Sequence, residues 1–223
     1  MKTIIEQNLL DIKHEIEPYK PNIIAVTKYF NHEAVLDAYQ AGLRDFGENR
    51  VLDAIAKINL LSDEIRQNSR FHLIGHLQSN KVKKAVGVFD LIHSVDSLEL
   101  AERINQEAEK RGIIQHILLQ VNNAGEEQKS GFEPVVLIDC FEKILELKNI
   151  KVDGLMNMAP LIEDKIELKR LFDEIAVLKN TLENKYGYKM DELSMGMSGD
   201  YAVAVASGAT MIRIGRKLFA DKV

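Results

Sequence analysis

A lysine stands where a buried strand is expected to end. Residues 23–27, Ile-Ile-Ala-Val-Thr, are apolar or β-branched, and Lys28 follows them directly. Such a run predicts a fully buried strand, so Lys28 should carry its amine to the carboxyl end of that strand. A neutral amine is the form that condenses with an aldehyde to give a Schiff base. On position alone, a lysine that only reaches solvent from a strand end is an equally good interpretation.

Two glycine-containing turns near the end of the chain could bind an anion. In the first, SMGMSGD at 194–200, Ser198 can cap the following helix. Helix N-terminal amides and a hydroxyl together suit phosphate oxygens, although an ordinary serine cap is the alternative. In the second, RIGR at 213–216, Gly215 leaves room for backbone amides to approach a ligand.

The elements that must position these residues alternate along the chain. Strands are expected at residues 23–27, 43–46, 71–74, 91–93, 116–121, 152–155, 192–195 and 210–214. Helices are expected at residues 31–41, 49–61, 78–86, 97–112, 134–147, 166–186 and 199–207. An amphipathic helix precedes the first strand, and a final helical turn follows Gly215.

Eight strand-then-helix units predict an α/β fold, a (β/α)8 TIM-type barrel with an extra N-terminal helix. We expect residues 1–223 to form one domain, although a missed or invented strand would favour an open, Rossmann-like sheet. In such barrels the active site lies at the carboxyl ends of the strands, and the loops after strands seven and eight often bind phosphate. Lys28 and these two loops together suit a phosphorylated aldehyde.

Composition excludes several classes of protein. The 223 residues are 46% apolar and 28% charged, which is typical of a globular protein, and the net charge of −5 gives no general attraction to nucleic acid or anionic membranes. Cys140 is the single cysteine, so we expect no internal disulfide and favour the cytoplasm. No apolar run approaches the roughly 18 residues that a membrane-spanning helix needs.

A set of short motifs, in order along most of the chain, resembles the YggS/PROSC family of pyridoxal phosphate homeostasis proteins. The motifs are AVTK at 25–28, FGEN at 46–49, HLIGHLQSNK at 72–81, HSVDS at 93–97, KSG at 129–131, GLM at 154–156, SMGMSGD at 194–200 and RIG at 213–215. The resemblance implies a barrel like the N-terminal barrel of alanine racemase, with pyridoxal 5′-phosphate as cofactor.

The resemblance also implies roles for individual residues. Lys28 would form the Schiff base, and Asn49 would lie beside the cofactor. Ser198, with Met195 in the same motif, and the backbone at Gly215 would hold the phosphate.

Two arginines follow from the same motif at the end of the last strand. Arg213 would approach the pyridine nitrogen and, because it is permanently charged, keep that nitrogen unprotonated, which makes the ring a poor electron sink. Family members commonly have a hydroxyl residue where this chain has Arg216, whose backbone amide could contact the phosphate instead.

The function implied is a protein of vitamin B6 homeostasis that stores or delivers pyridoxal phosphate without efficient turnover. Apo-enzymes that use the cofactor are possible recipients, and we expect a monomer or weak homodimer. The alternative is a racemase-like enzyme. Against it, alanine racemases bring a second acid/base from another domain, for which we expect no room in this chain. A third interpretation is a barrel that binds a sugar or nucleotide phosphate and uses Lys28 only as a charge contact.

Other polar residues have a structural interpretation. His72, His93 and His116 lie in or next to expected strands without a nearby carboxylate or cysteine pattern, so structural roles are favoured over metal binding. His76 follows a strand and could line the mouth of the barrel. Lys129, in KSG, is expected to be a solvated loop residue.

Overall fold

Eight parallel strands form a closed barrel. The computed structural model describes residues 3–125 and 130–220. The strands pair in sequence order, and β8 closes the barrel by pairing with β1. They are β1 (Asn22–Val26), β2 (Asp45–Glu48), β3 (Arg70–Leu73), β4 (Leu91–Val95), β5 (Gln115–Val121), β6 (Ile150–Asn157), β7 (Glu192–Met197) and β8 (Met211–Ile214). The prediction of an eight-stranded barrel is confirmed.

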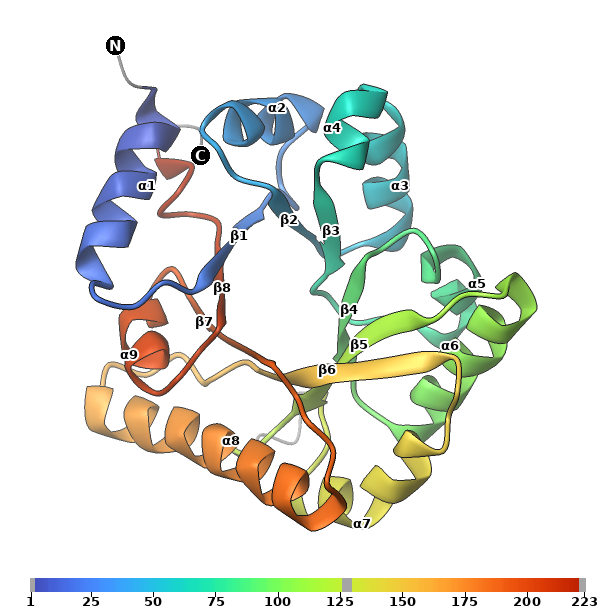
Figure 1. Ribbon diagram of the computed structural model, residues 1–223. Helices are drawn as coiled ribbons and strands as arrows, with labels where there is room; N and C mark the ends of the chain where they lie inside the picture. The colour runs from blue at the N-terminus through green and yellow to red at the C-terminus, as the bar shows by residue number, and fades with distance from the viewer. Residues whose placement is uncertain (1–2, 126–129, 221–223) are drawn as a thin grey trace.

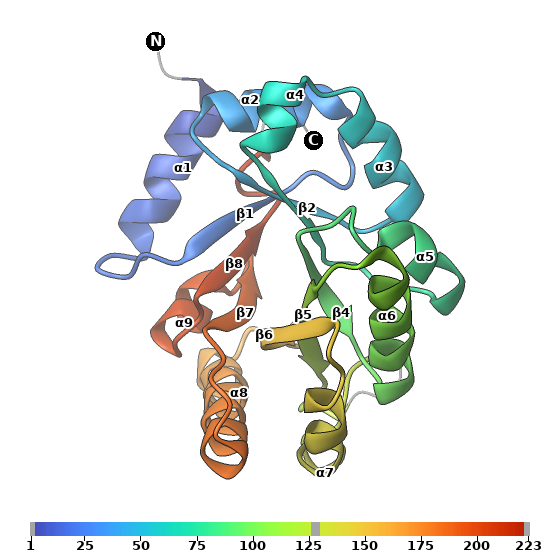
Figure 2. The ribbon, with the colours of Figure 1, turned by 45° about the vertical axis from the view of Figure 1, so that its right-hand side comes forward.

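Helices surround the barrel, as Figures 1 and 2 show from two directions. They are α1 (Ile4–Glu15), α2 (His32–Gln40), α3 (Val51–Asn59), α4 (Asp63–Gln67), α5 (Val82–Ala85), α6 (Leu98–Arg111), α7 (Pro134–Leu145), α8 (Lys165–Tyr186) and α9 (Tyr201–Ala206), with a 3-10 turn, η1 (Ser79–Lys81), before α5. The sequence analysis missed α4, where Ser62 accepts the amide of Ile65 at the helix start.

Local sequence explains where the well-defined helices begin and end. The Ser97 side chain accepts the amide of Leu100 at the start of α6, and Gly112 ends that helix with a φ of 63°. Asp164 caps α8 in the same way, and Gly187 ends it in the left-handed conformation. These residues satisfy amides that a helix start leaves free, and glycine adopts a positive φ without steric cost.

The apolar core has two parts, because alternate residues of each strand face opposite sides. A large cluster includes residues of the strands and the surrounding helices, and a small one contains Ile24, Leu91, Leu118, Met156 and Met211. On β8, Ile212 belongs to the large cluster and Met211 to the small one. The small cluster is therefore the apolar part of the barrel interior, and Arg213 shares the inward side with Met211.

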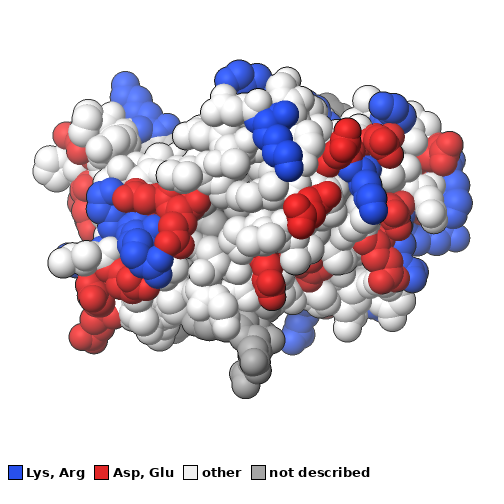
Figure 3. Space-filling model, turned by 90° about the horizontal axis from the view of Figure 1, so that it is seen from below, with Lys and Arg blue, Asp and Glu red and all other residues white. Residues whose placement is uncertain are grey.

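The described surface carries charges of both signs. Figure 3 shows acidic and basic side chains interspersed around a broad uncharged region on the face that it presents. None of the helices in residues 3–125 and 130–220 is long and apolar enough to cross a membrane.

Candidate functional site

The parallel arrangement brings the predicted site residues to one edge of the barrel. Lys28 follows β1, Asn49 follows β2, Ser198 follows β7 and Gly215 follows β8. These four strands are consecutive around the barrel, because β1 pairs with β2 and β8, and β8 pairs with β7. Barrel closure therefore joins motifs from the two ends of the chain at the edge where barrel enzymes have their active sites.

Lys28 is partly exposed at this edge. Ile24 of β1 lies inside the barrel, and Lys28 follows the last residue of β1, Val26, by two positions. The amide of Thr27 donates to the carbonyl of Gly47 at 3.1 Å, so the pairing of β1 with β2 continues to the residue before Lys28. The Lys28 ammonium lies 4.9 Å from the centroid of the exposed Tyr29 ring. The amine is thus reachable from solvent while its backbone is anchored.

A buried ion pair supports the backbone before Lys28. Lys57 of α3 donates from Nζ to the Thr27 carbonyl at 2.7 Å and to Glu48 Oε1 at 2.5 Å. The Thr27 hydroxyl donates to the same carboxylate oxygen at 2.5 Å. The side chains of Lys57 and Glu48 are 9% and 4% exposed. Loss of either partner would leave a buried, unpaired charge, so this pair fixes the end of β1 tightly.

The structure shows that Ser198 does not cap the helix after β7, so that prediction is wrong. The residue before α9 is Asp200, which makes no side-chain cap; instead its Oδ1 accepts the amide of Met197 at 2.5 Å. This bond closes a turn, and α9 begins at Tyr201, two residues later than the sequence predicts. The Ser198 hydroxyl accepts the amide of Lys217 at 3.3 Å and so joins the loops after β7 and β8.

The side chains of two other predicted residues lie in different surroundings. Met195 is fully buried in the large apolar cluster, on the side of β7 opposite to Ser194. Its side chain therefore belongs to the core between strands and helices. The Arg216 side chain is exposed. Lys129 lies outside the described residues.

Arg213 is a buried cation close to the carboxyl edge. Its exposure is 4%. The guanidinium nitrogen Nη1 donates to the carbonyl and the hydroxyl of Ser194 at 2.7 and 2.6 Å, and Nη2 donates to the carbonyl of Asn157 at 2.8 Å. Burial lowers the pKa of Arg213 to about 10 and the charge of Asp200 opposes this, so the guanidinium stays charged at neutral pH. Three of its five N–H groups are used in these bonds.

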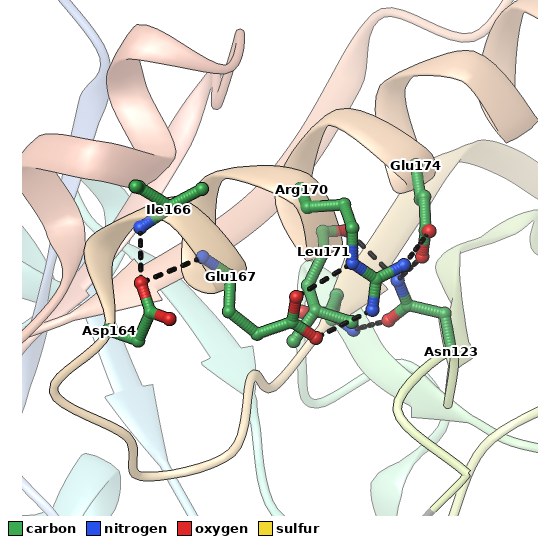
Figure 4. A network of polar contacts seen from close by, with 8 residues as sticks. Asn123, Asp164, Ile166, Glu167, Arg170, Leu171 and Glu174 are labelled. Atoms are coloured by element: carbon green, nitrogen blue, oxygen red, sulfur yellow. Dashed lines mark hydrogen bonds and ion pairs between the residues drawn. The ribbon is translucent and has the colours of Figure 1, made fainter.

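A second set of contacts links Arg213 to α8. Asn157 donates from Nδ2 to Asn123 Oδ1 at 2.9 Å, and Asn123 donates to the carbonyl of Leu171 and to Glu174, both at 2.9 Å. Figure 4 shows Asn123 beside the ion pairs that Arg170 forms along α8. The Asn157 Oδ1 atom is buried and has no hydrogen-bond partner among the described residues. A buried oxygen without a partner can accept a hydrogen bond from a ligand.

A line of hydrogen bonds leads from Arg213 across the barrel interior. His93 Nδ1 lies 3.0 Å from the Ser194 hydroxyl, His93 Nε2 lies 2.9 Å from His72 Nδ1, and His72 Nε2 lies 2.8 Å from Asp45 Oδ1. Burial is the largest cause that holds the pKa of His93 well below 6.5, and the positive charge of Arg213 acts in the same direction. His93 is therefore neutral at physiological pH.

The sequence analysis missed the partners of these polar residues. His72 and His116 each pair with an aspartate on a neighbouring strand, Asp45 and Asp153 respectively. His76 lies 3.3 Å from Asp96 at the mouth of the barrel. Within the part of the chain that the structure describes, no group of three or more histidine, cysteine, aspartate or glutamate residues could hold a metal ion.

One missed residue left a signal in the sequence. Val51, Ala54 and Lys57 are the buried residues of α3, at a spacing of three residues. A lysine in an apolar stripe of a helix indicates a buried partner, which here is Glu48.

Comparison with known proteins identifies the fold of this site. The model of the alanine racemase N-terminal domain family matches residues 3–222. Alanine racemase from Clostridium difficile has a TM-score of 0.76 at 19% identity, and the alignment covers 96% of this chain and 56% of that one. At this identity the likeness concerns the fold. The site therefore lies on a barrel of the class that forms the N-terminal domain of alanine racemases.

Relatives with higher sequence identity show to which family within this class the chain belongs. The pyridoxal phosphate homeostasis protein of Aquifex aeolicus is 40% identical over 90% of this chain and 86% of its own, and that of Vibrio alginolyticus is 35% identical over 96% of both. PipY of Synechococcus elongatus PCC7942, solved with pyridoxal phosphate bound, has a TM-score of 0.87 at 39% identity over 96% of this chain and 99% of its own. The chain belongs to the pyridoxal phosphate homeostasis protein family.

The neutral state of His93 predicts a pH dependence of stability. Because the pKa of His93 is held below 6.5 in the folded protein, only the unfolded chain takes up its proton as the pH falls below 6.5. The free energy of unfolding should then decrease on acidification, by up to about 1.4 kcal/mol per pH unit from this residue. Urea denaturation at a series of pH values should show a shallower decrease for His93→Asn. Parallel slopes for the two proteins would contradict the prediction.

Proposed function

We propose that this chain binds pyridoxal 5′-phosphate, holds it covalently on Lys28, and stores or delivers it as part of vitamin B6 homeostasis. One observation carries the proposal: a partly exposed lysine, two glycine turns and a buried guanidinium meet at one edge of the barrel. The names of the relatives and the cofactor bound in PipY support it. The single cysteine favours the cytoplasm as the place of this role.

The turns after β7 and β8 fit a phosphate group. A Cβ atom added to Gly215 would lie 3.4 Å from Val26, an ordinary contact, and one added to Gly199 would meet nothing within 4 Å. Packing inside the protein therefore does not require glycine at either position, whereas a ligand held by backbone amides would. We assign phosphate binding to the Ser198 hydroxyl and the backbone at Gly215 and Arg216. Met195 would contribute only through its backbone.

The other residues of the edge would hold the ring. Asn49 follows β2 next to Lys28, and a Cβ on Gly75 would lie 2.4 Å from the Asn49 carbonyl, so glycine lets the backbone after β3 approach Asn49 closely. Arg213 would donate to the ring nitrogen with an N–H group that its protein contacts leave available. The cofactor itself supplies an aldehyde that condenses reversibly with an amine and a ring that can accept electrons.

The charge of Arg213 favours a carrier over an enzyme. A guanidinium with a pKa of about 10 donates a hydrogen bond and does not give up its proton at neutral pH. The ring nitrogen beside it would stay unprotonated, so the ring would withdraw little charge from a reacting carbon. Lys28, by contrast, needs only to exchange its amine with another amine, and its partial exposure suits that exchange. We propose apo-enzymes that use the cofactor as the recipients.

Replacing Lys28 tests the covalent link. Lys28→Ala should abolish the visible absorption band of the loaded protein and the borohydride-stable label on residues around 28, while the far-UV circular dichroism stays unchanged, because the side chain ends at the surface of the barrel. Mass spectrometry of the reduced, digested protein measures the label. Lys151→Ala, near the amino end of β6 and thus at the opposite edge, is the matched control. A main label on another lysine in purified Lys28→Ala would overturn the assignment.

Replacing Ser198 tests the phosphate site. Ser198→Ala should weaken binding of pyridoxal phosphate about tenfold, because a hydroxyl bonded to an anion contributes roughly 1.5 kcal/mol or more. Binding of pyridoxal, which lacks the phosphate, should change little. Equilibrium titrations of both compounds provide the comparison. Ser97→Ala, which removes a true helix cap at the start of α6, should lower stability by about 1 kcal/mol and leave both affinities unchanged. Equal losses for the two compounds in Ser198→Ala would disprove the phosphate role.

Turnover distinguishes the carrier from a racemase-like enzyme. The loaded protein should show no racemase, transaminase or decarboxylase activity that approaches an ordinary enzymatic rate of about one per second. Chiral chromatography and α-deuterium exchange over the common amino acids measure this, with Lys28→Ala as the control. Lysine-dependent turnover at that rate would favour the enzyme.

A further inference from the structure

Polar side chains occupy one side of the barrel interior, in a continuous line. Asp45, His72, His93 and Ser194 lie on β2, β3, β4 and β7, and the line ends at Arg213 on β8. Because β4 and β7 are not neighbours in the barrel, the bond between His93 and Ser194 spans its interior. A small apolar cluster fills other inward positions of the barrel. The line thus connects the carboxyl edge with Asp45, which begins β2 at the opposite edge.

The two ends of the line fix the direction of its outer hydrogen bonds, and one arrangement of the inner bonds leaves both histidines neutral. Arg213 can only donate, so the Ser194 oxygen accepts from it, and in this arrangement the Ser194 hydroxyl donates to His93 Nδ1. His93 must then carry its proton on Nε2 and donate to His72 Nδ1. His72 in turn carries its proton on Nε2 and donates to Asp45, a carboxylate that only accepts. In this arrangement each donor points away from Arg213.

The charges around the line agree with this direction. Asp45 accepts from His72 and from Arg70, whose side chain is 56% exposed. Burial acts to raise the pKa of Asp45, but these hydrogen bonds outweigh it and the pKa lies below its ordinary value. At the other end the cation is Arg213, with Asp200 as the charged group that acts on it. An ionised carboxylate and a guanidinium at the two ends polarise the neutral groups between them in the same sense, which strengthens each bond.

We propose that His93 and Ser194 are positioning residues: through this directed line they hold the Arg213 guanidinium in one orientation, with its free N–H groups available to an unprotonated aromatic ring nitrogen at the carboxyl edge. The identity of that ring rests on the proposed function, whereas the line itself does not. Ser194 is made a strong acceptor because it donates its own proton to His93. Arg213 therefore stays charged and fixed without a carboxylate in direct contact among the described residues.

Packing alone does not explain the line. Apolar side chains such as Leu118, Met156 and Met211 fill the adjacent interior, and apolar replacements of buried polar groups are often neutral or stabilising when the whole group is replaced. A line of four polar residues is a poorer way to fill a barrel. Its advantage is direction, because in the arrangement with neutral histidines each member satisfies its neighbours.

Nuclear magnetic resonance of the cofactor-free protein tests the direction. In protein labelled with nitrogen-15, we expect His72 and His93 to be neutral with the proton on Nε2, and to show a scalar coupling through the bond from His93 Nε2–H to His72 Nδ1. The Nη signals of Arg213 should be separate, because a fixed guanidinium does not rotate. A doubly protonated His72, or His93 protonated on Nδ1, would overturn the proposal.

Variants test whether the line holds Arg213. In His93→Leu and Ser194→Ala the Nη signals of Arg213 should merge as its rotation becomes faster. In His93→Asn, whose Oδ1 can accept the Ser194 proton, much of the separation should return. His116→Leu, which removes a histidine paired with Asp153, is the matched control and should leave the signals unchanged. If His93→Leu does not fold, Ser194→Ala makes the same comparison with the loss of one oxygen. Unchanged Arg213 signals in the folded variants would show that the role is wrong.

The loaded protein supplies a readout at the ring. With pyridoxal phosphate labelled with nitrogen-15 in the ring, the wild type should give the shift of an unprotonated, hydrogen-bonded nitrogen. In His93→Leu and Ser194→Ala the shift should move toward that of an unprotonated nitrogen without a donor, and the affinity should fall about tenfold, as expected for one hydrogen bond from a charged donor. An identical ring shift in all variants would overturn the proposal. Failure of the wild type to bind the cofactor would instead disprove the proposed function, and the measurements without cofactor would still decide the role of the line.

Discussion

A permanent positive charge inside the barrel is the constraint around which its interior is arranged. Arg213 is 4% exposed, and taking a guanidinium out of water is costly unless other groups replace the lost hydrogen bonds. Ser194 and Asn157 supply three oxygen acceptors, and the residues behind Ser194 continue to the carboxylate of Asp45. One side of the interior is polar for this reason, while the other keeps the apolar packing that is usual in such barrels. These contacts hold the positive charge of Arg213 in a fixed position near the carboxyl edge of the barrel.

The edge itself combines two kinds of support. On the side of β1 and β2, the buried pair of Lys57 and Glu48 anchors the backbone at Thr27, so the base of Lys28 is rigid although its amine is partly exposed. On the side of β7 and β8, turns with glycine present backbone amides, and the Ser198 hydroxyl joins the two loops. A reactive group on a rigid base beside an anion site is an arrangement that can hold a phosphorylated aldehyde and release it to another amine.

Much of the fold could be predicted because its signals are local. Five consecutive residues predict the buried strand before Lys28. The caps of α6 and α8 depend on residues within three positions of each other. The rule that strands of a parallel barrel present their carboxyl ends at one edge then placed Lys28, Asn49 and Gly215 together. Ser198 lies at this edge as predicted, but its hydroxyl accepts the amide of Lys217 and does not cap α9. The start of α9 depends on the bond between Asp200 and Met197, and that competing turn had no distinct signal in the pattern.

The sequence by itself therefore determined the number of strands, the closure of the sheet and the edge where the chemistry-bearing residues meet. Only the tertiary structure decided what those residues contact. His93 and Ser194 are 101 positions apart, and His72 and Asp45 are 27 apart, so no local pattern connects them. The apolar stripe of α3 indicates that Lys57 is buried, but it does not identify the partner Glu48, which lies across the junction of a strand and a helix. Hydrogen bonds and ion pairs act over about 3 Å, and such distances between remote residues exist only after the barrel has closed.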